Sequence, residues 1–117
     1  MINVLVTCGG GFQGMTLYKS LKNIKGTSLH LFDINTENVS KYFFDFFVTT
    51  PPIKKKRGYI KLLESYVVKH NIRFIFPATS FDLDLLSELK NKENRNAQFR
   101  TAICLIICPG RWYNLVL

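Results

Sequence analysis

The strongest constraint on the fold of this chain lies in its first fourteen residues, where an apolar run leads directly into a glycine-rich segment. The run is Ile2–Val6, and Gly9, Gly11 and Gly14 follow it at the spacing G-x-G-x-x-G. This order is typical of a buried strand, a tight turn and the start of a helix in a β-α-β unit. The glycines permit the tight turn and a close approach of the backbone to a ligand. The sequence therefore predicts an α/β fold that opens with a glycine loop.

Strand and helix patterns alternate along the chain up to about residue 90. Apolar runs and helical spacing predict strands at 2–6, 28–32, 43–48 and 72–76, and helices at 12–24, at 55–70 and from 80 onward. Gly26 and Asn71 are predicted to end the first two helices, and Thr79 with Asp82 has the form of a capping box. Such alternation predicts a Rossmann-like three-layer α/β/α domain with a mostly parallel sheet.

Length, charge and cysteine content narrow the class of protein. The chain has 117 residues, a formal net charge of +8 and three cysteines at no metal-binding or redox spacing. No apolar run approaches the roughly 18 residues of a membrane span. Since no signal peptide is evident either, we expect a cytoplasmic protein without a membrane association. No pattern of histidine and cysteine predicts a metal site.

The glycine loop is the first candidate site. Gly9, Gly10, Gly11 and Gly14 precede a predicted helix whose free backbone N–H groups suit an anion. Asp33 ends the second predicted strand, near the position of the acid that binds a ribose in dinucleotide-binding folds. We therefore take these five residues as candidate cofactor-binding residues. The alternative is a purely structural turn with a strand-end acid.

A second candidate site follows the fourth predicted strand. Thr79, Ser80 and Asp82 would border the same cleft as the glycine loop, which makes them candidate substrate-binding residues. Helix capping is the alternative for Thr79 and Asp82. Cys8 lies in the glycine loop near a helix N-terminus, an environment that lowers the pKa of a thiol. No base partner for Cys8 is identifiable, so we interpret Cys8 as a small residue of the loop, and the sequence predicts no catalytic residue.

The opening of the chain is similar to that of extended short-chain dehydrogenases and sugar-nucleotide epimerases. Residues 4–14 resemble their T-G-x-x-G-x-x-G motif, with Cys8 in place of its first glycine. Their alanine-rich loop after the fourth strand is absent here. Tyr18 and Lys22 have the spacing of their catalytic pair but fall on the wrong helix. This resemblance implies an NAD(P)-binding domain, which is the alternative function.

A resemblance over residues 1–90 points to another family. The ordered motifs are V-L-V-T with the glycine turn, Leu31-Phe32-Asp33, the aromatic strand before Pro51, Ile72–Pro77 and the helix opening Ser80–Leu86. Together they resemble the N-terminal (pre-ATP-grasp) domain of ATP-grasp ligases, in the branch like the carbamoyl-phosphate synthase large subunit. The resemblance implies a non-catalytic, substrate-side domain of an ATP-dependent carboxylate–amine ligase.

That resemblance also implies which partners the chain has. ATP and Mg²⁺ belong to the later ATP-grasp module of such ligases, so we expect no cofactor on this fragment alone, and a small acceptor substrate in its cleft. Residues 91–117 do not resemble the family's continuation. We expect them to be an atypical tail with one or two extra strands, produced by a frameshift or truncation. The face that would meet the missing module is expected to cause self-association.

A basic cluster, Lys54–Arg57, leaves a third alternative open. It predicts either a solvated helix start or the surface of a small interaction domain that binds an acidic partner. No pattern of aromatic residues accompanies it, which argues against nucleic acid.

Overall fold

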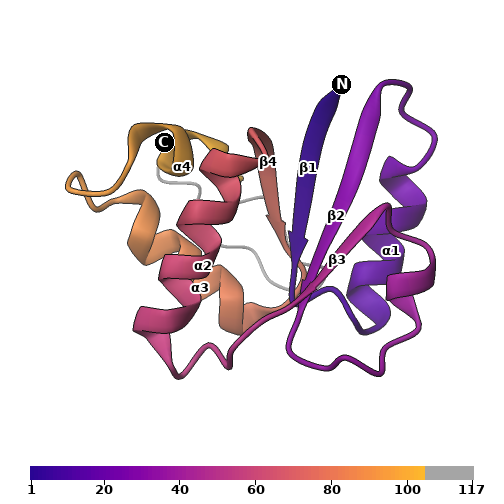
Figure 1. Ribbon diagram of the computed structural model, residues 1–117, viewed down its shortest axis with the longest axis horizontal. Helices are drawn as coiled ribbons and strands as arrows, with labels where there is room; N and C mark the ends of the chain where they lie inside the picture. The colour runs from indigo at the N-terminus through magenta and orange to yellow at the C-terminus, as the bar shows by residue number, and fades with distance from the viewer. Residues whose placement is uncertain (105–117) are drawn as a thin grey trace.

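A four-stranded parallel sheet forms the middle layer of the protein in a computed structural model that describes residues 1–104 (Figure 1). Its strands are β1 (Ile2–Thr7), β2 (Thr27–Asp33), β3 (Phe46–Thr49) and β4 (Ile72–Pro77), in the order β3-β2-β1-β4. All three neighbouring pairs are parallel. The predicted parallel sheet is therefore confirmed. The strand order changes direction between β1 and β4, the position at which open α/β sheets bind ligands.

Helices cover both faces of the sheet, which confirms the predicted three-layer Rossmann-like arrangement. Figure 1 shows α1 on one side of the strands and α2, α3 and α4 on the other. The bounds are Phe12–Leu21 for α1, Lys56–Lys69 for α2, Ser80–Lys90 for α3, Ala97–Ala102 for α4, and Ser40–Tyr42 for the 3-10 turn before β3. Within residues 1–104, no helix has the length and apolar character needed to cross a bilayer.

The alternation of side chains along β1 explains the two cores. Val4 and Val6 face α1, whereas Leu5 faces α2, α3 and α4. The larger core lies on the α2 side, where buried side chains of β1, β2, β4, α2, α3 and α4 meet. Its fully buried members include Phe32, Leu63, Val67, Ile75, Leu86, Leu89 and Phe99. This pattern of continuous apolar strands is expected of a parallel sheet that is covered on both faces.

Some predicted boundaries were wrong by a few residues. The first helix ends at Leu21 rather than Ile24, and Ile24 is 51% exposed because it lies in the turn after the helix. The third strand begins at Phe46, since the 3-10 turn occupies the chain up to Tyr42. The predicted stop at Asn71 is confirmed, because Asn71 follows the C-cap of α2 with a φ of 49°. The predicted stop at Gly26 was wrong, because Lys22 caps α1 and Gly26, with a φ of 80°, lies in the turn before β2.

The tail contains a helix that the sequence pattern did not predict. Asn96 caps α4 by accepting a hydrogen bond from the N–H of Phe99 at 3.2 Å, and Phe99 is fully buried against the α2 side of the sheet. A strand was expected over residues 102–108, but Ala102 ends α4, and Ile103 forms a single parallel bridge with Ile75. Residues 105–108 lie outside the described residues. The division of the chain at residue 90, and the frameshift or truncation, stay predictions.

A buried histidine lies near the amino-terminal end of the sheet. The Nδ1 of His30 is 2.6 Å from the Tyr66 hydroxyl, and its Nε2 is 3.3 Å from Oδ1 of Asn3. The imidazole also stacks on the ring of Phe46. Burial, followed by the charge of His70, lowers the pKa of His30 to about 4. His30 is therefore neutral at pH 7.

We expect His30 to make the fold sensitive to acid. Its pKa is about 4 in the folded chain and about 6.5 in the unfolded chain. Protonation therefore favours unfolding, and the stability is lost as the pH falls from 6.5 towards 4. Urea unfolding gives the free energy of unfolding of each protein at about pH 7.5 and about pH 5. Between these pH values, the free energy of unfolding should fall by about 2 kcal/mol less in His30→Gln than in the wild type. Equal losses in the two proteins would contradict the buried, neutral imidazole.

Candidate functional site

A cavity of about 600 Å³ lies at the carboxyl edge of the sheet. The segments that follow β1, β2, β3 and β4 all contribute to it, as expected from parallel strands that end at one edge. Its lining residues are Cys8, Asp33, Ile34, Thr50, Pro51, Pro52, Ile53, Lys54, Lys56, Thr79 and Phe81. The structure thus brings Asp33 of the first predicted site and Thr79 of the second to a single cavity.

The predicted glycines have different physical roles. A Cβ atom on Gly14 would overlap the carbonyl group of Gly9, so Gly14 permits the close packing of α1 on the loop. A Cβ atom on Gly9 would meet side chains of Val6 and Leu31. Gly11 faces open space and begins α1 without a side-chain cap, and the first turn of α1 contains no acidic residue. The start of α1 therefore leaves its backbone N–H groups open to an anion.

Asp33 is held against the glycine loop by the backbone. Its Oδ1 accepts a hydrogen bond from the N–H of Gly10 at 3.1 Å, and its Oδ2 accepts one from the N–H of Asn35 at 3.0 Å. The N–H of Gly9 donates to the carbonyl oxygen of Phe32 at 3.1 Å. The carboxylate is therefore oriented before any ligand binds, and each of its oxygens keeps a free lone pair for a hydroxyl donor.

Asp82 connects α3 to the end of β1. It is fully buried, and it accepts hydrogen bonds from the Thr7 hydroxyl, from the N–H of Ala78 at 3.3 Å, and from both the N–H (3.0 Å) and the hydroxyl (2.7 Å) of Thr79. The predicted capping box is formed. Burial raises the pKa of Asp82 above its ordinary value, while the hydrogen bonds from Thr7 and Thr79 oppose that rise.

The predicted substrate residues thus differ in their access to the cavity. Thr79 lines it, whereas Asp82 is buried beneath it, and Ser80, the first residue of α3, is half-buried and not part of the lining. A direct contact between substrate and Ser80 or Asp82 stays a prediction. The geometry around Asp82 is the one expected of a structural carboxylate that holds two segments together.

The pKa of Cys8 is not lowered by the nearby helix N-terminus, which fits the interpretation of Cys8 as a small loop residue. Burial, followed by the charge of Asp82, raises the pKa of this thiol to about 12. The nearby helix N-terminus does not offset the loss of water around the sulfur. Cys8 also has a φ of 51°, the left-handed conformation that glycine adopts readily, and it stands where the dehydrogenase motif has a glycine.

The sequence reasoning missed the apolar wall of the cavity. This wall is formed by Ile34, Ile53, Phe81 and the pair Pro51–Pro52. The prolines indicated only that the third strand ends there. Phe81 is 77% exposed, although it belongs to a helix whose other apolar residues face the core. In residues 1–104, no group of three or more His, Cys, Asp or Glu side chains is arranged to hold a metal ion.

Comparison with known proteins shows the fold. No protein-family model and no curated protein sequence matches this chain. Among solved structures, the chain is similar to a dTDP-glucose 4,6-dehydratase from Bacillus anthracis in complex with NAD, with a TM-score of 0.52 and 19% sequence identity. The similarity covers 77% of this chain and 35% of the dehydratase chain, so it spans about a third of that protein. It supports the Rossmann-like fold.

Proposed function

We propose that this chain is the N-terminal, substrate-side domain of an ATP-dependent carboxylate–amine ligase of the ATP-grasp class, and that it is not catalytic by itself. One observation carries the proposal. The segments with the ligase resemblance, from the glycine turn, the end of β2, the prolines after β3 and the start of α3, all contribute to or border one cavity. Motifs that are scattered in sequence thus surround a common binding volume.

In this proposal the residues of the chain bind and orient an acceptor substrate. The ammonium groups of Lys54 and Lys56 suit a carboxylate or another anionic group. The Thr79 hydroxyl donates its proton to Asp82, so it offers a lone pair to a donor group of the substrate. Pro51 and Phe81 offer apolar contact to the rest of a small molecule and exclude water from it. ATP and Mg²⁺ belong to the proposed ATP-grasp module, where they would supply the activation of the carboxylate.

Exposed apolar side chains beside β4 form a strip, which is expected of a domain that packs against a further module. Ile2, Ile24 and Phe74 are 41%, 51% and 39% exposed. They line a groove of about 190 Å³ on the α1 side of the sheet, together with Phe76. We propose that the ATP-grasp module covers this strip, and that the isolated chain self-associates through it.

An NAD(P)-binding domain is the second candidate, and the geometry of Asp33 favours it. The carboxylate lies at the end of β2 and is hydrogen-bonded to the glycine loop. The uncapped start of α1 is next to that loop. This is the arrangement by which dinucleotide-binding folds hold a ribose hydroxyl and a pyrophosphate.

Calorimetric titration with NAD, NADP and ATP/Mg²⁺ separates the two candidates. The ligase proposal predicts no binding of any of these nucleotides by the isolated chain up to about 1 mM. The dehydrogenase candidate predicts micromolar binding of NAD that weakens by about tenfold or more in Asp33→Ala. Asp84→Ala, which removes an exposed carboxylate on α3, is the control and should leave binding unchanged. NAD binding that depends on Asp33 would contradict the ligase proposal.

The gene provides a second test of the ligase proposal. ATP-grasp motifs in the DNA that follows codon 117, in any reading frame, are the expected result. Their absence from that DNA in independent isolates would contradict the proposal.

A further inference from the structure

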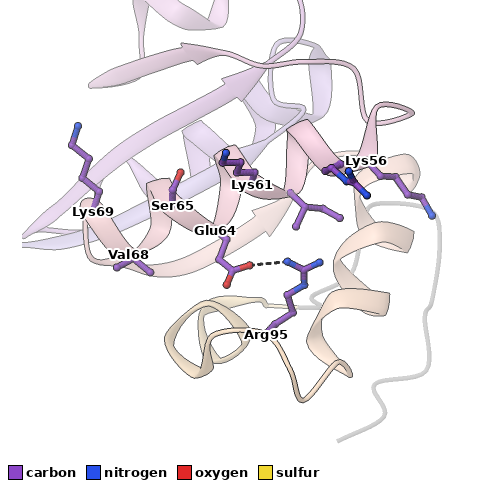
Figure 2. A pocket seen from close by; sticks show the side chains of 9 residues that line it. Lys56, Lys61, Glu64, Ser65, Val68, Lys69 and Arg95 are labelled. Atoms are coloured by element: carbon purple, nitrogen blue, oxygen red, sulfur yellow. Dashed lines mark hydrogen bonds and ion pairs between the residues drawn. The ribbon is translucent and has the colours of Figure 1, made fainter.

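A second cavity, of about 750 Å³, lies along α2 beside the segment between α3 and α4. It is lined by Lys56, Arg57, Ile60, Lys61, Glu64, Ser65, Val68, Lys69 and Arg95. We call it the basic groove. Figure 2 shows Lys56 and Lys69 near opposite ends of α2, with Glu64 pointing towards Arg95 between them. Among the described lining residues, only Lys56 also lines the cavity at the carboxyl edge of the sheet.

Three cations of the basic groove, Arg57, Lys61 and Lys69, lie in one row along α2, in which Ser65 takes the place between Lys61 and Lys69. Arg57, Lys61, Ser65 and Lys69 are each four residues apart on α2, so they follow one ridge of the helix with a rise of about 6 Å per step. All four side chains belong to exposed residues. On another helix, acidic side chains that are four residues apart also lie along one face, with the same spacing as these cations.

Acidic side chains of the chain itself do not neutralise this row. Glu64 is the one acid among the described lining residues, and both of its oxygens are engaged. Its Oε2 is 3.2 Å from Nη1 of Arg95, and its Oε1 accepts a hydrogen bond from the N–H of Asn96 at 3.3 Å. Within residues 1–104, no ion pair involves Arg57, Lys61 or Lys69.

The position of these charges works against the stability of α2. Lys56 and Arg57 occupy its first turn, which contains no acidic residue, although the N-terminal end of a helix favours negative charge. Arg57 and Lys61 are like charges four residues apart, an arrangement that destabilises a helix. Lys69 suits the C-terminal end of α2, but Arg57 and Lys61 do not benefit the helix, and an external acidic partner would relieve their repulsion.

We propose that the basic groove docks an acidic helical segment of a partner protein. Carboxylates four residues apart on that segment would meet Arg57 and Lys61. Apolar side chains of that segment would pack at two places, on the exposed edge of Ile60 and, about two helical turns further along α2, on Val68, which is 46% exposed. None of the described lining residues is aromatic, so the groove offers no surface for stacking nucleic-acid bases. This inference depends on neither proposed function.

Fluorescence anisotropy with a labelled probe tests the docking surface. The probe is a capped helical peptide with Glu at every fourth position and Leu three residues after each Glu, and a scrambled peptide of the same composition is its control. Arg57→Glu/Lys61→Glu should weaken binding of the probe by about tenfold or more. Lys19→Glu/Lys25→Glu makes the same change in net charge on the α1 side of the sheet, and should weaken binding by less than about twofold.

A variant of the apolar contact and several alternative ligands complete the test. Val68→Ser leaves the charges in place, and should weaken binding several-fold by removing apolar contact. If thermal unfolding shows that Arg57→Glu/Lys61→Glu does not fold, Val68→Ser still tests the groove. Equal weakening by the two double variants would overturn the proposal, because it would show attraction by net charge alone. Equal binding of the scrambled peptide, or tighter binding of a thymidine oligonucleotide or of phosphatidylserine vesicles, would also overturn it.

Discussion

Gly14→Ala is expected to abolish cooperative folding or to destabilise the protein by at least about 3 kcal/mol. The added Cβ atom would overlap the carbonyl group and the Cα atom of Gly9. Both are main-chain groups, and Gly9 is tied to β2 through its hydrogen bond to Phe32. Relief of the overlap therefore requires α1 to move away from the sheet. Urea unfolding followed by far-ultraviolet circular dichroism measures the effect.

Gly11→Ala is the matched control for this prediction. A Cβ atom on Gly11 meets nothing within 4 Å, and its φ of −99° is open to any residue. Alanine is only a poorer helix cap, so the expected loss is below about 1 kcal/mol. The same unfolding midpoint for both variants would contradict the close packing of α1 on the glycine loop.

Asp82→Ala has the second largest expected effect, a loss of about 3 to 5 kcal/mol in the free energy of unfolding. The substitution removes the acceptor of hydrogen bonds from the Thr7 hydroxyl and from the N–H groups of Ala78 and Thr79. These groups lie where water does not easily replace the carboxylate, because Asp82 is fully buried. Thermal and urea unfolding measure the loss.

Asp84 offers the control for Asp82, since it is exposed on the same helix. Asp84→Ala should change the free energy of unfolding by less than about 0.5 kcal/mol. The comparison also decides the role of Asp82. A stable Asp82→Ala variant would contradict the structural role and favour the predicted contact with substrate.

Much of the fold was predictable because local patterns and tertiary packing agree. Continuous apolar runs such as Ile2–Val6 predicted buried parallel strands, and the leucines of α3 predicted its buried face. The capping box of Thr79 and Asp82 was predictable from two residue types at one spacing. Helix α4 was not, because its six residues have a short apolar pattern and are held mainly by the burial of Phe99.

The candidate site was predictable only in part. The order of elements predicts that Asp33 and Thr79 meet at one edge of the sheet, and they line the same cavity. The pKa of Cys8 was not predictable, because it depends on the water excluded by the surrounding fold and on the charge of Asp82, which lies far away in sequence. Nor does a local pattern indicate that Pro51 and Phe81 form one apolar wall.

The sequence by itself determined the Rossmann-like sheet and its glycine loop, because strand and helix periodicity and the steric demand of Gly14 are local properties. Only the tertiary structure decided that Asp82 joins α3 to the end of β1 and that burial raises the pKa of the Cys8 thiol. It also decided that the cations of α2 share a groove with Arg95. These features depend on burial and on distances between residues far apart in the chain, which exist only once the layers have packed.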